Sequence, residues 1–148
     1  MVKIKITFLV EKPIEHVFEL ISDISDYRRW VPYKSKFFIE NKLTSEGLFG
    51  LGTTYIDQLR CWGKSIGEII EYQPPSKIKF QQKTLFGLPV FRAKIKYTLK
   101  ALQNCTEVIH EVEAIPYGFF KLLEPILSII LHSERERTCQ AIKRALEQ

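Results

Sequence analysis

Residues 90–115 have the sequence VFRAKIKYTLKALQNCTEVIHEVEAI, two alternating segments separated by a short polar turn. The first segment, Val90–Leu102, alternates apolar and mostly basic residues, and the second, Thr106–Ile115, alternates apolar and mostly acidic ones. A period of two is typical of a strand with one buried face. The stretch therefore predicts an antiparallel hairpin that turns at Gln103-Asn104.

The apolar members of each segment share one face of this hairpin, which we expect to be the inner face of a sheet. This face carries Phe91, Ala93, Ile95, Tyr97 and Leu99 on the first segment, and Val108, His110 and Val112 on the second. The basic and acidic side chains then point outward. His110 is a polar group on an apolar face, which makes it a candidate functional residue.

Five more segments have strand character and are separated by turn signals. They are Val2–Val10, Ser35–Glu40, Thr53–Trp62, Lys64–Tyr72 and Lys77–Thr84. Alternation places Phe80 and Gln82 on the inner face of Lys77–Thr84. On Thr53–Trp62 we favour an inward set that contains Tyr55, Asp57, Leu59 and Cys61. With the hairpin, these segments predict seven strands.

Three helices are expected. Lys12-Pro13 opens the first, which ends at Ser22-Asp23, and a second short helix carries Ile24, Tyr27 and Trp30 before Pro32. The third runs from about Tyr117 to Leu146, with a kink expected at Pro125. Its first half is apolar on more than one side, so we expect the sheet or another surface to cover it. Its second half, around Glu134–Arg137, is expected to be a solvated face with local ion pairs.

The bulk composition excludes several classes of protein. The net charge is +5 and the pI about 9.1, which favours anionic partners without requiring them. The cysteines Cys61, Cys105 and Cys139 form no CxxC pair, so we expect no metal site and no disulfide framework. Met1–Val10 lacks the features of a signal peptide, and Tyr117–Leu131 is too short and too charged to span a bilayer. We therefore expect a cytoplasmic protein with no transmembrane segment, no cofactor and no DNA partner.

Three stretches resemble the START-like, polyketide cyclase/dehydratase superfamily. They are KPIEHVFELISDISDYRRWVP (12–32), WGKSIGEIIEYQPPSKIKF (62–80) and GFFKLLEPIL (118–127). Among its branches the chain is most similar to the polyketide-cyclase-like, the coenzyme Q-binding and the ribosome-association toxin proteins. The resemblance implies one α+β domain over residues 1–148 with the helix-grip order β-α-α-β6-α. In that fold a seven-stranded curved antiparallel sheet wraps around a long C-terminal helix.

The resemblance also implies a cavity between sheet and helix that takes lipids, quinones, polyketides, steroids or plant hormones. The first functional hypothesis is therefore a carrier or sensor of a small hydrophobic molecule, acting as a monomer or homodimer. The strand alternation and the last helix predict the cavity lining. The expected ligand-binding residues are Phe80, Gln82, Phe91, Ile95, Tyr97, Val108, His110, Val112, Phe120, Leu123 and Leu127.

Two alternatives remain open at the level of sequence, since this fold hosts several activities. In the first, the protein is a cyclase, aromatase or dehydratase that uses His110 as acid or base, with Tyr97 or Asp57 as its partner. The competing interpretation is that His110 is a hydrogen-bonded core residue. In the second alternative, the protein contacts a ribosome or another macromolecule, which predicts that lysines and arginines gather in one patch.

Overall fold

A computed structural model describes residues 1–23, 38–59 and 63–147 of the chain. The elements follow the order strand, helix, six strands and a long helix. They are β1 (Val2–Val10), α1 (Ile14–Ser22), β2 (Phe38–Leu43), β3 (Thr54–Leu59), β4 (Gly63–Gln73), β5 (Lys77–Phe86), β6 (Pro89–Ala101), β7 (Thr106–Pro116), the 3₁₀-helix η2 (Gly118–Leu123) and α2 (Glu124–Glu147).

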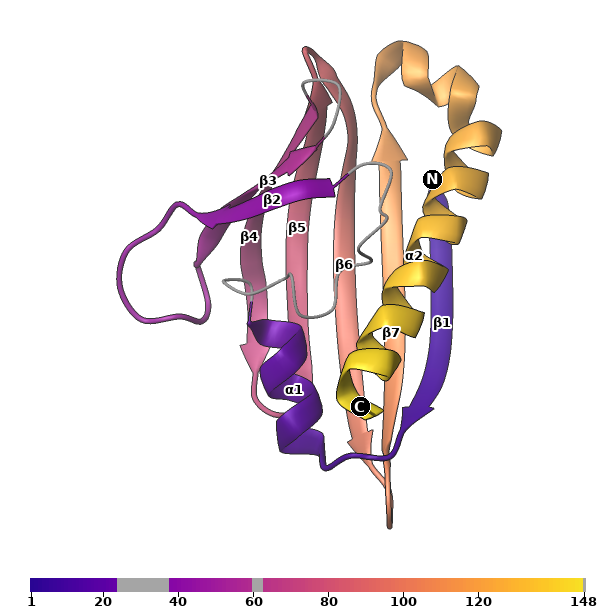
Figure 1. Ribbon diagram of the computed structural model, residues 1–148. Helices are drawn as coiled ribbons and strands as arrows, with labels where there is room; N and C mark the ends of the chain where they lie inside the picture. The colour runs from indigo at the N-terminus through magenta and orange to yellow at the C-terminus, as the bar shows by residue number, and fades with distance from the viewer. Residues whose placement is uncertain (24–37, 60–62, 148) are drawn as a thin grey trace.

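The seven strands form one antiparallel sheet in the order β1-β7-β6-β5-β4-β3-β2. The hairpin predicted from residues 90–115 is confirmed as β6 and β7, in which Tyr97 lies opposite His110. Figure 1 shows α1 and α2 on the same face of the curved sheet, with α2 along β7 and β1. The expected α+β fold with a seven-stranded sheet and a long C-terminal helix is therefore confirmed.

Alternation in the strands produces the core, because every second side chain of the sheet points toward the helices. The inner positions of β6 and β7 are buried along nearly their whole length, as the alternation predicted. Val17, Phe18, Leu20 and Ile21 of α1 complete the core from above the sheet. These side chains form the face of α1 that packs against the rest of the core.

Several predicted boundaries need correction. The strand expected over Ser35–Glu40 corresponds in its described part to β2, which continues to Leu43, and the strand expected from Lys64 begins at Gly63. The short helix expected to carry Ile24, Tyr27 and Trp30 lies outside the described residues. The predicted kink at Pro125 is wrong. A separate 3₁₀-helix precedes α2, and Pro125 lies in the first turn of α2. Proline is tolerated there, since first-turn N–H groups have no helical partner.

The apolar half of the last helix is not covered by the sheet. Phe119, Leu122 and Ile129 are 67%, 76% and 72% exposed, and neither η2 nor the first turns of α2 contain a buried residue. The buried positions of α2, Cys139 and Ile142, lie in its second half. The expectation that the sheet buries the first half is therefore wrong, which leaves the alternative of another covering surface.

Candidate functional site

Three polar side chains meet on the otherwise apolar inner face of the sheet. Tyr97 and His110 are paired across β6 and β7, with ring centroids 4.5 Å apart. Arg135 reaches them from α2. Its Nε donates a hydrogen bond to His110 Nε2 at 3.1 Å, and its terminal nitrogen lies 3.5 Å from the Tyr97 hydroxyl. We call Tyr97, His110 and Arg135 the inner polar cluster.

The inward direction of Arg135 corrects the sequence-based expectation of a solvated face over Glu134–Arg137. Its neighbours behave as expected, since Arg137 forms a local ion pair with Glu134 at 3.7 Å. Arg135 itself lies four residues before Cys139 and seven before Ile142, so all three share one helix face. Because Cys139 and Ile142 are buried against the sheet, that face carries Arg135 inward as well. This spacing is the sequence signal that identifies Arg135.

The contact with Arg135 fixes the protonation state of His110. A guanidinium only donates hydrogen bonds, so Nε2 must be the unprotonated nitrogen and Nδ1 carries the proton of the neutral ring. Burial lowers the pKa of His110 well below 6.5, and the nearby Arg135 charge lowers it further. Nδ1 is buried and has no hydrogen-bond partner among the described residues. His110 is therefore a neutral ring with one unpaired buried donor.

This arrangement predicts a loss of stability as the pH falls through 6.5. In the unfolded chain His110 binds a proton at its ordinary pKa of ~6.5, whereas in the folded protein it stays neutral. Since the unfolded state then binds more protons, the free energy of unfolding decreases by up to ~1.4 kcal/mol per pH unit. Urea unfolding between pH 8 and pH 5 measures this slope. The variant His110→Gln is expected to show a flatter profile, and equal slopes in the two proteins would contradict the assignment.

Tyr97 and Cys139 are held in their neutral forms. Burial raises the pKa of Tyr97 to about 12, although the Arg135 charge opposes the shift. Burial likewise raises the pKa of the Cys139 thiol to about 11. Tyr97 therefore keeps its hydroxyl proton at neutral pH. Tyr97 and Arg135 together present hydrogen-bond donors to any oxygen atom placed beside them.

A second group of polar side chains lies toward the other edge of the sheet. Gln82 donates to the Tyr55 hydroxyl at 2.6 Å, and its side-chain nitrogen lies 3.5 Å from Asp57 Oδ2. Ser65 and Thr84 are hydrogen-bonded to each other at 2.8 Å in the adjacent row. Tyr55 and Asp57 are both buried, as the inward set favoured for this strand requires, whereas Leu59 is partly buried and Cys61 lies outside the described residues. Burial raises the pKa of Tyr55 above its usual value, and the charge of Asp57 adds to the shift.

Gly67 leaves the space through which Tyr55 reaches Gln82. Gly67 of β4 is paired with Tyr55 on one side and with Gln82 on the other. A Cβ atom at Gly67 would lie 2.2 Å from Tyr55 Cζ, so the tyrosine ring occupies the space of the missing side chain. The ring thus crosses β4 to reach β5. The strand alternation alone provided no indication of this role for Gly67.

The structure brings together part of the site predicted from the sequence. Of the expected catalytic residues, His110 and Tyr97 are in contact, whereas Asp57 lies with Gln82 and Tyr55 and makes no hydrogen bond to His110. Of the expected lining, the β6 and β7 residues Ile95, Tyr97, Val108, His110 and Val112 are buried, as is Phe80. Gln82, Phe91, Phe120 and Leu127 are partly buried, and Leu123 is exposed.

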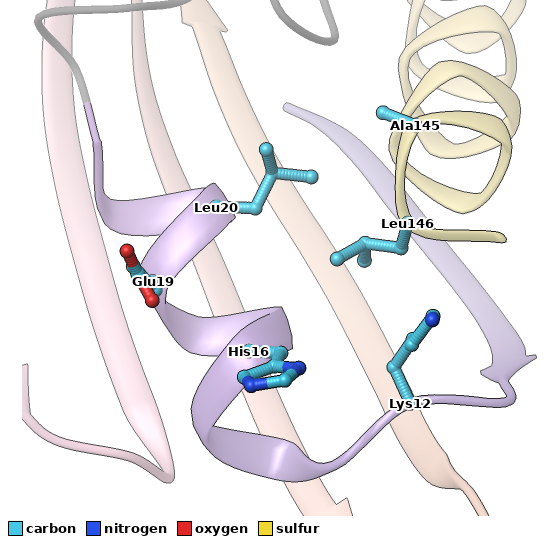
Figure 2. A pocket seen from close by; sticks show the side chains of 6 residues that line it. All are labelled: Lys12, His16, Glu19, Leu20, Ala145 and Leu146. Atoms are coloured by element: carbon cyan, nitrogen blue, oxygen red, sulfur yellow. The ribbon is translucent and has the colours of Figure 1, made fainter. Parts of the chain in front are cut away.

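A small pocket opens between α1 and the C-terminal end of α2 (Figure 2). Its volume is about 200 Å³, and no residue of the predicted lining contributes to it. It is lined by Lys12, His16, Glu19, Leu20, Ala145 and Leu146. Ligand pockets usually have volumes of ~300 to 1,000 Å³ and mostly apolar walls. This pocket is smaller and half of its lining residues are polar, so it does not correspond to the expected ligand site.

Neither metal-binding clusters nor membrane-spanning helices are found in the described part of the chain. Residues 1–23, 38–59 and 63–147 contain no group of three or more His, Cys, Asp or Glu side chains placed to hold a metal ion. In the same residues no helix combines the length and apolar character that a membrane span requires.

Comparison with known proteins gives matches at the level of structure. No protein-family model and no curated protein sequence matches the chain. Protein CV1439 from Chromobacterium violaceum superimposes with a TM-score of 0.77 at 16% identity, covering 100% of this chain and 99% of its own. A START superfamily protein from Mycobacterium smegmatis gives a TM-score of 0.76 at 13% identity, with 99% and 97% covered.

A third similar structure is DynU16, from the dynemicin biosynthetic locus, with a TM-score of 0.68 at 14% identity. The match covers 99% of this chain and 47% of DynU16, so the chain spans about half the length of that protein. Identities this low carry information about the fold alone. The fold implied by the resemblance in sequence is thereby confirmed: the chain has the START-like, helix-grip fold.

Proposed function

We propose that this protein binds a small, mainly apolar molecule that carries an oxygen acceptor, a carboxylate or a ketone, at one end. The observation that supports the proposal most directly is the inward guanidinium of Arg135. It is partly buried and is hydrogen-bonded to two neutral groups, His110 and Tyr97. Among the described residues, no carboxylate forms an ion pair with it.

A cation on an apolar face is expensive unless an acceptor compensates it. Arg135 has five N–H donors, and its contacts with His110 and Tyr97 leave others for a ligand. A carboxylate can accept two parallel bonds from a guanidinium, and a ketone can accept one from Arg135 and one from the Tyr97 hydroxyl. The polar end of the ligand is thus matched by the inner polar cluster.

The apolar part of the ligand is matched by other residues of the predicted lining. Ile95 on β6, Val108 and Val112 on β7, and Phe80 on the neighbouring β5 lie beside Tyr97 and His110 and carry no polar atom in their side chains. An apolar surface with a few convergent polar groups is the usual construction of a small-molecule site. A START superfamily protein is among the structural neighbours, which is consistent with ligand binding.

Native mass spectrometry of the protein purified from its own source tests this proposal. We expect a fraction of the protein to carry one small molecule, which is released on denaturation and contains a carboxylate or ketone oxygen. A protein that carries no small molecule, and that takes up none from a lipid extract of the same source, would contradict the proposal.

The second candidate is a cyclase or dehydratase, which is favoured by the similarity to DynU16, a protein encoded in a biosynthetic locus. In that case Arg135 and Tyr97 would stabilise the enolate oxygen of a polyketide-like substrate. His110 is poorly placed to act as the base, because its unprotonated nitrogen already accepts a bond from Arg135. The same mass spectrometry separates the two functions. A binder releases its ligand unchanged, whereas a dehydratase converts it to a product lighter by one water.

A further inference from the structure

One end of the molecule is formed by two segments that are distant in sequence. The turn between β5 and β6 and the 3₁₀-helix η2 lie next to each other, because the Tyr117 backbone N–H donates to the Val90 carbonyl at 2.8 Å. Figure 1 shows both at the same end of the sheet, where the chain leaves β7 and enters α2. This end is opposite to the pocket between α1 and the end of α2.

Large apolar side chains project into solvent at this end. Ile126 and Ile129 are three residues apart on α2 and therefore lie on one side of that helix, and Leu122 precedes them in η2. Phe119 of η2 and Leu88 of the β5–β6 turn are also largely exposed. We call this surface the apolar end; its members are Phe86, Leu88, Phe119, Leu122, Ile126 and Ile129. Exposed apolar side chains gathered at one end of a protein are typical of an interaction site.

Cations lie beside the apolar end on the outer face of the sheet. Lys83 and Arg92 are directly opposite each other on β5 and β6, and the Lys83 ammonium lies 5.8 Å from the Tyr117 ring. Lys64 is paired with Leu85 in the adjacent row, and Lys121 belongs to η2 itself. Glu124, the acidic residue that follows η2, is paired with the N-terminal ammonium. The charge next to the apolar side chains is therefore mainly positive.

We propose that the apolar end docks onto the surface of a lipid bilayer that contains anionic lipids. Exposed apolar side chains next to a group of cations are complementary to such a surface. The side chains enter the boundary between headgroups and acyl chains, while the lysines and arginines meet the headgroup phosphates. The apolar half of the last helix, left bare by the sheet, then has a covering surface.

Two other occupants fit the observations less well. A second copy of this chain would bring its own Lys83, Arg92 and Lys121 to the contact, and like charges would repel across it. An RNA surface would accept the cations, but it offers no apolar environment for Leu122, Ile126 and Ile129. The bilayer is the partner that uses both the apolar side chains and the cations.

Vesicle flotation tests the proposal on the full chain. The probes are vesicles of phosphatidylcholine alone and vesicles in which about 30% of the lipid is phosphatidylglycerol, at ionic strengths near 0.1 M. We expect binding to the anionic vesicles and much weaker binding to the neutral ones. The variant Lys83→Gln/Arg92→Gln is expected to bind the anionic vesicles about 25-fold more weakly, at roughly fivefold for each cation removed. The variant Leu122→Ser/Ile129→Ser is expected to lose at least about tenfold.

Leu48→Ser/Leu51→Ser is the matched control. These leucines are 99% and 70% exposed, and they lie between β2 and β3, at the opposite edge of the sheet from β7. The control is expected to bind like the wild type. All three variants change exposed positions, and their circular dichroism melting curves verify that they fold.

Four results would overturn the proposal. They are equal binding to neutral and anionic vesicles, an equal loss in the leucine control, no binding to either vesicle, and unchanged binding in both test variants. Size-exclusion chromatography with light scattering tests whether a second copy of this chain covers the apolar end. That occupant is assigned if the wild type is a dimer, Leu122→Ser/Ile129→Ser is a monomer, and neither binds vesicles. Co-sedimentation with ribosomes assigns it to RNA if only the cation variant fails to sediment. Detection of a bound ligand by native mass spectrometry does not depend on any of these outcomes, since it involves residues inside the sheet.

Discussion

Replacing Arg135 by methionine is expected to weaken ligand binding tenfold to a hundredfold while the protein remains folded. A hydrogen bond to a charged group contributes ~1.5 to 3 kcal/mol, and each 1.4 kcal/mol corresponds to a factor of ten. Methionine keeps most of the volume and the flexibility of the arginine stem, but it cannot donate to a ligand oxygen. The substitution is therefore expected to lower the affinity for the ligand.

Two opposing effects keep the stability change of Arg135→Met small. Removing a partly buried cation from an apolar face is favourable, whereas His110 Nε2 loses the donor that it accepts from. We expect the free energy of unfolding to change by less than ~2 kcal/mol. Urea unfolding gives this value, and titration with the molecule recovered from the wild-type protein gives the affinity.

Arg137→Met is the matched control for this experiment. Arg137 is on the same helix, but it pairs with Glu134 and is exposed to solvent. Exposed ion pairs contribute ~0 to 1 kcal/mol, so this variant should resemble the wild type in both measurements. If the two variants bind equally well, Arg135 does not hold the ligand and the proposed site is wrong.

Replacing Gly67 by alanine is expected to destabilise the protein by ~3 kcal/mol. The new methyl group would lie 2.2 Å from the ring of Tyr55, which is completely buried and cannot rotate toward solvent. Overpacking of this kind costs ~1 to 3 kcal/mol, and displacement of the ring also removes its hydrogen bond to Gln82. Urea unfolding of the variant measures the effect.

Gly63→Ala provides a sharp comparison, because the apparent clash is equally close. A Cβ atom at Gly63 would lie 2.3 Å from the Phe86 ring, but that side chain is 36% exposed and can rotate toward solvent. We therefore expect a cost below ~1 kcal/mol. Similar costs for the two variants would show that the burial of the opposing ring does not control the response to a new methyl group.

The strands and their inner faces follow from local patterns in the sequence. A period of two places every second side chain on one side regardless of the rest of the fold, so alternation in Val90–Leu102 and Thr106–Ile115 was sufficient to place Tyr97 and His110 inward. The same reasoning placed Tyr55 and Asp57 correctly. These are local consequences of strand geometry, and they need no knowledge of which elements pack together.

Which of these inward groups meet depends on how the elements pack in three dimensions. Asp57 and His110 both point inward, yet β3 and β7 are separated by three strands, so the pair expected from the sequence does not form. Arg135 reaches His110 because α2 crosses the sheet above β7, a placement that no local pattern encodes. The exposure of the apolar half of the last helix also depends on this packing. The helix meets the sheet along its second half, so Phe119–Ile130 keeps an apolar surface that the sheet does not cover.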